Sequence, residues 1–350
     1  MTSPLYPWQE TAWLQLQQMR ARLPHAILFY GAAGIGKTAF AEHFAQSLLC
    51  QTPQEDGHPC GRCLSCGWFS QYAHPDFRRV RPEVLDEDGA EEGEDSDKGS
   101  EAAADGKKSG KASKAPSKDI KIDQIRALAD FMNISTHRQG LRVVVLYPAE
   151  ALNTASANAL LKTLEEPPPS TVFLLVSNSL DRLLPTILSR CRKFALNMPS
   201  REQALAWLDL QKVEQAEAWL AEQGGAPLAA LAQAESGTQE AMDDFLRYLA
   251  RPGIEGALKT ADKFQKTAVI DLVSWLQRWQ YDVFSHKLSG HIRYFPRYRA
   301  ELTALAGRVE VAALLKALKS ANDRRAIAEH PLSAKLFIED MLLEYALLFS

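Results

Sequence analysis

The stretch GAAGIGKT, Gly31 to Thr38, fits the phosphate-loop pattern G-x-x-x-x-G-K-[S/T] at every defined position. Glycines let successive backbone N–H groups converge on phosphate oxygens, and the N-terminus of the following helix adds about half a positive charge. The lysine of such a loop reaches the β and γ phosphates, and the hydroxyl after it ligates Mg²⁺. The stretch therefore predicts a nucleotide cradle that consists of Gly31, Gly34, Gly36, Lys37 and Thr38.

The residues around this loop have the order that a phosphate loop requires. The apolar run HAILFY (25–30) predicts a strand before it, and AFAEHFAQSLL (39–49) predicts a helix with one buried face after it. Two further apolar runs, RVVVLY (142–147) and TVFLLVS (171–177), are typical of parallel strands that are covered on both faces. Strands that alternate with helices predict an α/β domain with a parallel sheet.

Two other parts of the chain have a different character. From about residue 200 the pattern is helical, and breaks at Gly224–Gly225 and Pro252–Gly253 predict a small all-α domain followed by a larger one. Residues 83–118 contain nine acidic residues between Glu83 and Asp97, followed by Gly, Ser, Ala and Lys. Because such a segment cannot bury enough apolar surface to offset its ordering entropy, we expect a disordered insertion there.

The composition limits the classes of protein to consider. The chain has 350 residues, of which 46% are apolar, and a formal net charge of −3, so no global basic field indicates nucleic acid. It has no apolar run of the length that a membrane helix needs, and its first residues, MTSPLYPWQE, lack the pattern of a signal peptide. We therefore expect a cytoplasmic protein.

The loop by itself does not establish hydrolysis of ATP. Hydrolysis requires a carboxylate at the end of a neighbouring strand to hold Mg²⁺, and a further group to orient water. After the run at 142–147, the expected Asp-Glu pair is replaced by Tyr147 and Pro148. Glu150 follows shortly afterwards, and it reads either as a displaced substitute or as an acid at the start of a helix.

Four of the five cysteines lie close together as Cys50, Cys60, Cys63 and Cys66. In a reducing compartment such a cluster predicts metal ligands rather than disulfides, and four thiolates close a tetrahedral, structural Zn²⁺ site. An iron–sulfur motif would need a further cysteine at position 70, where the chain has Ser70, so zinc is favoured. We expect Cys50 to end a helix and the other three to lie in a loop.

Together with the phosphate loop and the cysteines, SANALLKTLEEPP (156–168) and LPTILSRC (184–191) resemble the bacterial clamp loaders of DNA polymerase III, which are AAA+ proteins. Within that family the chain resembles the delta-prime branch more than the gamma/tau branch. The gamma/tau subunits have the Asp-Glu pair, and they place an arginine that senses the γ-phosphate at the position of Leu228.

This resemblance implies an α/β AAA+ P-loop domain followed by two all-α domains. Their bounds are 1–198 for the nucleotide-binding-type domain, 199–240 for a small helical lid and 241–350 for a helical collar domain. It implies that Arg190, in Ser189-Arg190-Cys191, reaches the nucleotide of a neighbouring subunit as an arginine finger. Asn178 matches the first sensor position.

The same resemblance implies a role for the whole chain. We expect a largely non-hydrolysing structural subunit that helps to load the sliding clamp onto primed DNA. Its partners would be the gamma/tau and delta subunits, the clamp, and primer–template DNA through the complex. The isolated chain would have no catalytic activity, although the holoenzyme is a DNA-directed DNA polymerase, a nucleotidyltransferase. Zn²⁺ would be structural, and ATP or ADP would be bound without hydrolysis.

Two rival interpretations remain open. The chain could be a DNA-stimulated ATPase in its own right that uses Glu150 or another acid. It could also be a zinc-dependent nucleic-acid-binding module in which the stretch HKLSGHIRYFPRYR (286–299) contacts nucleic acid by stacking and charge. A helix–loop–helix surface with buried aromatic residues is the simpler interpretation of that stretch.

Overall fold

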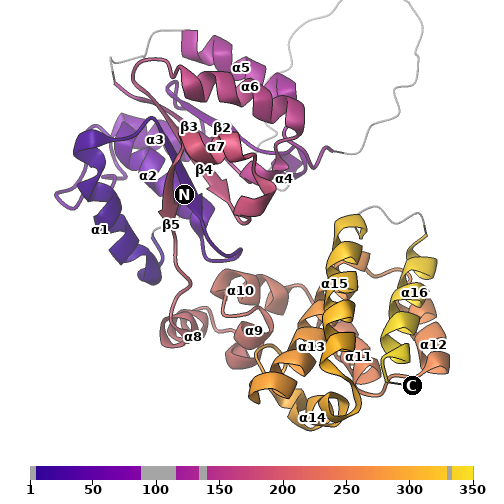
Figure 1. Ribbon diagram of the computed structural model, residues 1–350. Helices are drawn as coiled ribbons and strands as arrows, with labels where there is room; N and C mark the ends of the chain where they lie inside the picture. Colours follow the sequence, from indigo (N-terminus) through magenta and orange to yellow (C-terminus); the bar gives the residue numbers. More distant parts are fainter. Residues whose placement is uncertain (1–4, 88–115, 134–139, 329–332, 350) are drawn as a thin grey trace, which may run out of the picture. The chain divides into compact units, whose positions relative to one another are not determined.

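The computed structural model describes residues 5–87, 116–133, 140–328 and 333–349. The chain divides into two compact units, residues 1–198 and 199–350. The first is an α/β unit and the second is helical throughout its described residues, which confirms the predicted fold class (Figure 1). No helix in the described part is long and apolar enough to cross a membrane.

The first unit contains five strands and the helices that connect them. Its elements in chain order are η1 (Pro7–Gln9), α1 (Glu10–Gln18), η2 (Arg20–Arg22), β1 (Ala26–Tyr30), α2 (Lys37–Leu49), α3 (Leu64–Ser70), β2 (Phe77–Val80), α4 (Val84–Glu87), α5 (Ile122–Asn133), β3 (Arg142–Leu146), η3 (Ala149–Ala151), α6 (Thr154–Glu165), β4 (Thr171–Ser177), η4 (Leu180–Arg182), α7 (Pro185–Arg190) and β5 (Arg192–Ala195).

The five strands form one parallel sheet in the order β2-β3-β4-β1-β5. The predicted strands β1, β3 and β4 are its three central strands, and all of their residues except Tyr30 at the end of β1 are buried. Helices cover both faces, because alternate residues of these strands pack against different helices. Ala26 and Leu28 share a core with α5, α6 and α7, whereas Phe29 packs edge-on against Phe40 of α2 at 5.4 Å between ring centroids.

The two edge strands have no apolar run and were not predicted. β2 reads FRRV and β5 reads RKFA, and both expose charged side chains to solvent. Charged side chains on an edge strand discourage pairing with other chains, and they also hide the strand from a search for apolar runs. The sequence pattern therefore finds the centre of this sheet but not its edges.

The expected disorder of residues 83–118 is wrong at the flanks of that segment. Val84–Glu87 form the short helix α4, and the backbone N–H of Ser117 donates to the Glu83 carboxylate at 3.0 Å. Lys121 also pairs with Glu83, at 2.5 Å, so the two flanks are joined by side-chain contacts. The rest of the segment, residues 88–115, lies outside the described residues.

The second unit contains the remaining helices. They are α8 (Arg201–Leu210), α9 (Ala216–Glu222), α10 (Pro227–Glu235), α11 (Gln239–Ala250), α12 (Ile254–Phe264), α13 (Val269–Ser289), η5 (Pro296–Tyr298), α14 (Arg299–Arg308), α15 (Val311–Ile327) and α16 (Ala334–Leu347). Local signals set some of the ends: Ser200 and Gln203 form a capping box at the start of α8, and α13 ends at Gly290 with φ of 74°.

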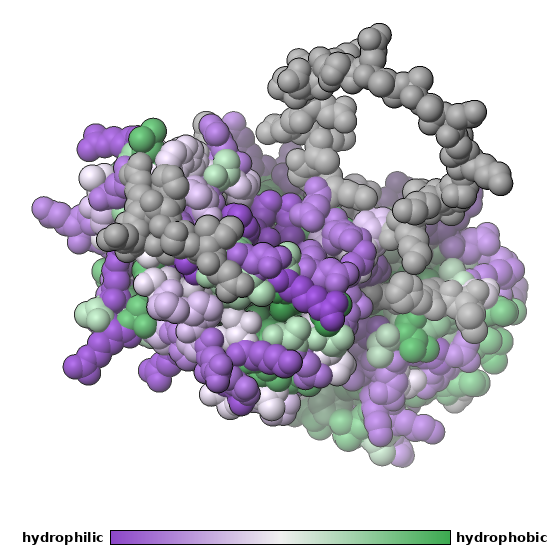
Figure 2. Space-filling model, turned by 90° about the horizontal axis from the view of Figure 1, so that it is seen from above, coloured by the Kyte–Doolittle hydropathy of each residue, from purple (hydrophilic) through white to green (hydrophobic). Residues whose placement is uncertain are grey.

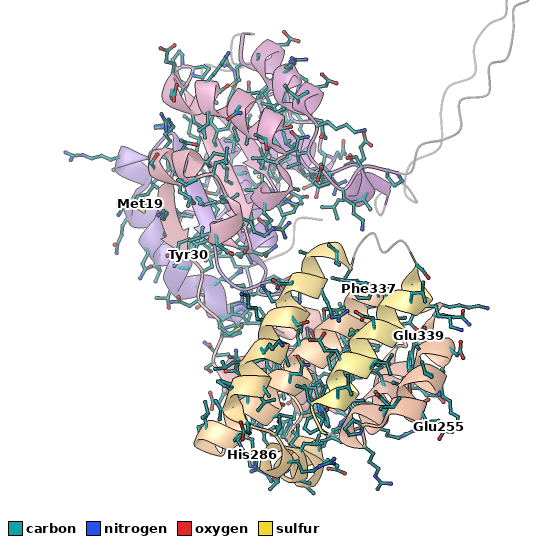
Figure 3. All side chains as sticks on the ribbon, turned by 45° about the vertical axis from the view of Figure 1, so that its right-hand side comes forward. Met19, Tyr30, Glu255, His286, Phe337 and Glu339 are labelled. Carbon is teal, nitrogen blue, oxygen red and sulfur yellow. The ribbon has the colours of Figure 1, made fainter. Side chains whose placement is uncertain are left out.

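The long helix α13 is the centre of this unit. The indole N–H of the buried Trp279 donates to the Tyr345 hydroxyl of α16 at 2.8 Å, and that hydroxyl donates to the Leu249 carbonyl of α11 at 2.8 Å. Figure 3 shows the side chains that fill the space between these helices. One core continues from α8 to the end of α16, and it includes Trp219 and Phe245. Because this core continues across residue 240, the predicted boundary between a lid and a collar domain at that residue stays a prediction.

Three arginines bind the end of α9 to the helices that follow. Arg297 pairs with the buried Glu222 at 3.1 Å, Arg278 donates to the Gln223 side chain at 3.0 Å, and Arg293 donates to the Gly224 carbonyl at 3.3 Å. These bonds join residues of the predicted lid to residues of the predicted collar domain. Figure 2 shows one face of the molecule, on which hydrophilic residues, in purple, cover much of the surface and hydrophobic residues, in green, lie among them.

Candidate functional site

The phosphate loop lies between β1 and α2, at the carboxyl end of the sheet, as the sequence predicts. Its glycines adopt backbone conformations that other residues rarely take, with φ of +155° at Gly31, +74° at Gly34 and +84° at Gly36. A Cβ at Gly31 would meet the Leu196 carbonyl oxygen at 2.3 Å. The loop therefore requires glycine at this position for two independent reasons, backbone conformation and space.

Lys37 begins α2, and only 4% of it is exposed. Its ammonium group donates to the carbonyl of Ala32, within the loop itself. Burial lowers the pKa of Lys37 to about 8, and the charge of Glu150 acts in the opposite direction. The lysine is thus enclosed by its own loop and lies within the electrostatic reach of one carboxylate from another strand end.

Residues near the N-terminus hold the loop from outside, which sequence reasoning missed. The Trp8 indole and the Gln9 side-chain amide both donate to the Ile35 carbonyl at 3.0 Å, and Gln9 also donates to the Gly36 carbonyl at 3.0 Å. A Cβ at Gly36 would lie 2.4 Å from the Tyr6 ring. The contacts of these N-terminal residues therefore support the backbone of the loop at Ile35 and Gly36.

Tyr147, at the end of β3, points toward α2. Its hydroxyl donates to the Glu42 carboxylate at 3.3 Å, and Glu42 also faces Arg79 of β2 at 3.8 Å. Burial raises the pKa of Tyr147 to about 12, so the phenol stays protonated at neutral pH. Its contacts are those of a structural side chain, and it supplies no carboxylate for Mg²⁺.

Glu150 lies in η3, just after β3, and it bridges two strand ends. Its Oε1 accepts the backbone N–H of Asn178, which directly follows β4, at 3.0 Å. Because β3, β4 and β1 are parallel neighbours, their carboxyl ends meet at one edge of the sheet. The sequence offered two interpretations of Glu150, and the structure places it in a short 3-10 turn whose carboxylate acts on Lys37.

The two other residues named by the resemblance lie apart from the loop residues in the sequence. Arg190 is the last residue of α7, and its side chain is 32% exposed. Its guanidinium donates to the Thr186 carbonyl at 3.0 Å and pairs with Glu165, the last residue of α6, at 2.5 Å. Leu228 is a partly exposed residue in the first turn of α10, in the second unit.

The four cysteines come together. Their sulfur atoms all lie within 4.8 Å of one another, and the Cys50 and Cys63 sulfurs are 3.9 Å apart. Four thiolates at about 2.3 Å from a shared zinc ion lie about 3.8 Å from each other in a tetrahedron, so the spacing fits this metal. Backbone N–H groups of Cys60, Cys63 and Cys66 also point at cysteine sulfurs at 3.3 to 3.4 Å.

One detail of this predicted site is corrected. Cys50 follows α2, as expected, but only Cys60 lies in the loop, because Cys63 caps α3 and Cys66 lies inside that helix. The loop between Cys50 and Cys60 packs on α1, where Trp13 stacks on His58 at 4.6 Å between ring centroids. The cysteine module is therefore joined to the body of the first unit.

Ser65, His74 and Asp76 meet beside this module, a grouping that sequence reasoning did not find. Ser65 Oγ and His74 Nε2 are 2.8 Å apart, and the Asp76 backbone N–H donates to His74 Nδ1 at 3.1 Å. Because Nδ1 accepts, Nε2 holds the proton and donates to the serine. A general base needs the opposite arrangement, so the geometry favours a structural link between α3 and β2.

Two other interpretations from the sequence agree with the structure. Cys191 is buried, and burial raises the pKa of its thiol to about 11, so it behaves as a small core residue. The stretch 286–299 is held by the buried Asp282 of α13, which accepts the backbone N–H groups of Arg293, Tyr294 and Phe295 at 2.7 to 3.1 Å. That loop is held from inside, which favours the structural interpretation.

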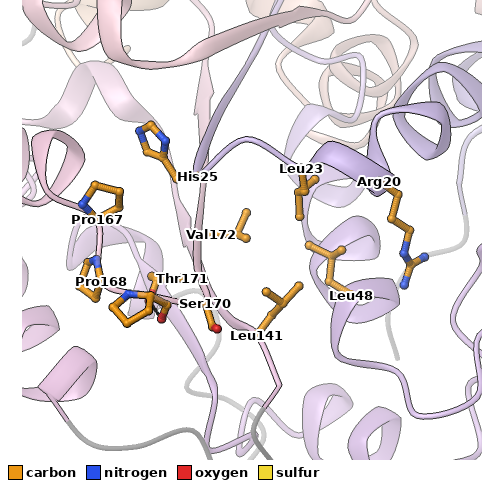
Figure 4. Close-up of a pocket in the computed structure, with 11 residues that line it drawn as sticks. Arg20, Leu23, His25, Leu48, Leu141, Pro167, Pro168, Ser170, Thr171 and Val172 are labelled. Carbon is orange, nitrogen blue, oxygen red and sulfur yellow. Dashed lines mark hydrogen bonds between the residues drawn. The ribbon is translucent and has the colours of Figure 1, made fainter.

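A cavity of about 500 Å³ opens at the opposite edge of the sheet from the phosphate loop. It lies where β1, β3 and β4 begin, and Figure 4 shows His25, Pro167 and Pro168 on one side, with Leu23 and Leu48 on the other. Its walls combine apolar side chains with polar ones, which include Arg20 and Thr171. None of the residues predicted for the nucleotide, the metal or the arginine finger lines it.

Comparison with known proteins identifies the family. The family model described as DNA polymerase III, delta subunit, matches residues 8–200. DNA polymerase III subunit delta' of Pseudomonas aeruginosa is 35% identical over 296 residues, which are 81% of this chain and 79% of that protein. The subunit delta' of Haemophilus influenzae is 32% identical over 81% of this chain and 78% of that protein.

A more distant relative, DNA polymerase III subunit gamma of Buchnera aphidicola, is 30% identical over 53% of this chain and 42% of that protein. The family model spans more than half of the chain, and both delta' proteins align over most of their own length. With a complete phosphate loop and no Asp-Glu pair after β3, the chain belongs to the family of DNA polymerase III delta-prime subunits.

Proposed function

We propose that this chain is a structural, largely non-hydrolysing subunit of a clamp loader, which helps to place the sliding clamp on primed DNA in the cytoplasm. The observation that carries this proposal is a complete phosphate loop beside a strand end that offers Tyr147 and Pro148 instead of two acids. A cradle without a Mg²⁺ carboxylate binds but does not turn over nucleotide. Its partners are gamma/tau and delta subunits, the clamp, and primer–template DNA through the assembled complex.

Within this role the predicted three-domain division has a purpose. An AAA+ domain (1–198) presents Arg190, and a lid (199–240) and a collar domain (241–350) connect it to the other subunits. The three arginine bonds at the end of α9 support a firm joint between lid and collar domain.

Arg190 acts in this proposal on the nucleotide of a neighbouring ATPase subunit. Its guanidinium is partly exposed at the end of α7, and the pairing with Glu165 holds it in one orientation. A guanidinium placed where phosphate oxygens gain charge contributes roughly 10³–10⁵ to the rate in related NTPases.

The cysteine module holds Zn²⁺ through Cys50, Cys60, Cys63 and Cys66, with no open coordination position. Support comes from the spacing of the four sulfurs and from the backbone N–H groups that point at them. The ion staples a long loop to α2 and α3, so its role is structural. The phosphate loop holds ATP or ADP through Gly31, Gly34, Gly36, Lys37 and Thr38.

One observation favours a rival, because Glu150 lies at the strand ends, its charge acts on Lys37, and it is the acid that an independent ATPase would use. Phosphate release by the purified chain, with and without primed DNA, separates the two functions. We expect release no faster than that of the Lys37→Ala variant. Turnover that DNA stimulates, and that Lys37→Ala or Glu150→Gln abolishes, would refute the structural role.

A further inference from the structure

Glu150 is a carboxylate at the phosphate loop for which the proposed function has no use. Its position is fixed, because its Oε1 accepts the backbone N–H of Asn178 at 3.0 Å. Glu150 follows β3 and Asn178 follows β4, so this bond connects two adjacent strand ends. This hydrogen bond holds the carboxylate at the two strand ends.

The second oxygen of the same carboxylate has a different environment. Glu150 Oε2 is buried, and among the described residues it has no hydrogen-bond partner. An unpaired buried carboxylate oxygen is costly unless a positive charge compensates it. The charge that acts on it here is Lys37, whose ammonium group is itself enclosed by the loop and bonded to Ala32.

The other acid near the start of α2 has partners of its own. Glu42 accepts the Tyr147 hydroxyl at 3.3 Å and faces Arg79 at 3.8 Å. Its charge is therefore paired with Arg79 of β2 rather than with the loop. The charge of Glu150 acts instead on Lys37, which is the residue that a phosphate loop uses for the β and γ phosphates.

We propose that Glu150 is a built-in counter-charge of Lys37 and makes the loop select nucleoside diphosphates over triphosphates. This inference rests on the proposed nucleotide cradle. A γ-phosphate brings further negative charge to the lysine, where it meets the charge of the Glu150 carboxylate, which the Asn178 backbone N–H holds in place. A diphosphate binds through the backbone N–H groups of the loop and places no phosphate at the γ position, so the charge of Glu150 still acts on Lys37.

The test uses the full-length chain with its zinc in place, and calorimetric titration with ADP and with ATP, each with and without Mg²⁺. The variant is Glu150→Gln, which keeps the size and the acceptor for the Asn178 N–H but removes the charge. The matched control is Glu166→Gln, the same charge change at an exposed residue. Lys37→Ala establishes that the bound nucleotide occupies the loop.

We expect the wild-type chain to bind ADP more tightly than ATP. Glu150→Gln should tighten ATP binding by about tenfold, the scale of one charge–charge interaction in a partly buried site, and ADP binding by much less. In the wild type, added salt should narrow the gap between the two nucleotides, since salt screens charges. Glu166→Gln should leave both affinities unchanged.

Two results would overturn the inference while leaving the cradle intact. One is an ADP-to-ATP ratio that Glu150→Gln does not change, and the other is weaker ATP binding by that variant in Mg²⁺, which would make Glu150 a metal ligand. If neither protein binds either nucleotide, the cradle itself is refuted, and the inference fails with it. If the Glu150→Gln variant does not fold, the wild-type chain gives the test. A ratio of ADP affinity to ATP affinity that added salt does not narrow would then overturn the inference.

Discussion

Replacing Asp282 by alanine should destabilise the second unit strongly, because this one carboxylate organises the loop after α13. Asp282 is fully buried. Its oxygens accept the backbone N–H groups of Arg293 at 2.8 Å, of Tyr294 at 3.0 and 3.1 Å, and of Phe295 at 2.7 Å. Asp282→Ala leaves three donors without an acceptor in the interior.

The magnitude follows from the number of donors. A buried donor that loses its partner costs about 1–3 kcal/mol, and water that enters the space recovers part of this. For three donors at the low end of that range, we expect a loss of about 3 to 5 kcal/mol in the free energy of unfolding. Asp282→Asn keeps one acceptor oxygen, so its loss should be smaller but clearly measurable.

Urea denaturation followed by tryptophan fluorescence measures this loss, since Trp279 packs against Phe295 with ring centroids 5.9 Å apart. Asp323→Asn on α15 is the matched control, because it removes the same charge from an exposed position. If the free energy of unfolding of Asp282→Ala lies within about 1 kcal/mol of that of the control, the carboxylate does not hold the loop. The nucleic-acid interpretation of 286–299 would then regain weight.

Two further predictions concern titration and metal. Burial raises the pKa of Glu222 to about 7, and the charge of Arg297 acts in the opposite direction. The stability that this group contributes is therefore fully present below the pKa that it has in the unfolded chain, and it is lost as the pH rises through about 7. The difference in free energy of unfolding between wild type and Glu222→Gln should therefore change by a few kcal/mol between pH 4.5 and 7.5, and a constant difference would contradict the burial argument. Metal analysis should find one zinc ion per chain, and Cys60→Ser with Cys63→Ser should release it and lower the unfolding temperature, whereas Cys191→Ser should retain the metal. If the wild-type chain is correctly folded but contains no zinc, the metal assignment is refuted.

The sequence predicted those parts of the fold that carry a strong pattern. Continuous apolar runs identified β1, β3 and β4 because both faces of these strands are buried. The edge strands β2 and β5 were not predicted, because about half of their side chains face solvent and several are Arg or Lys. Likewise Val84–Glu87 looked disordered from the local excess of acids, although contacts with Ser117 and Lys121, distant in the sequence, order the flanks of that segment.

In the candidate site, as in the fold, motifs predict some of the residues, whereas the contacts between distant residues are seen only in the structure. The loop glycines, Lys37 and the four cysteines belong to motifs with fixed spacings, so the sequence predicts both sets. The structure brings the four sulfurs within 4.8 Å of one another, and the binding of nucleotide and of zinc stays a prediction. The contacts of Trp8 and Gln9 with the loop, and the contact of Glu150 with Asn178, join residues 26 to 28 positions apart, and no motif predicts that these pairs meet. The Glu150–Asn178 contact follows from strand order and the Trp8 and Gln9 contacts follow from tertiary packing, neither of which the sequence alone gives.

The most direct test compares two substitutions in a clamp loader reconstituted with its ATPase subunits. Lys37→Ala removes the lysine of this chain's own loop, and Arg190→Ala removes the guanidinium at the end of α7. We predict that DNA-stimulated ATP turnover of the complex stays near the wild-type rate with Lys37→Ala and falls at least tenfold with Arg190→Ala, while assembly is unchanged in both. The reverse pattern, turnover lost with Lys37→Ala and kept with Arg190→Ala, would contradict the account, because this chain would then hydrolyse its own nucleotide.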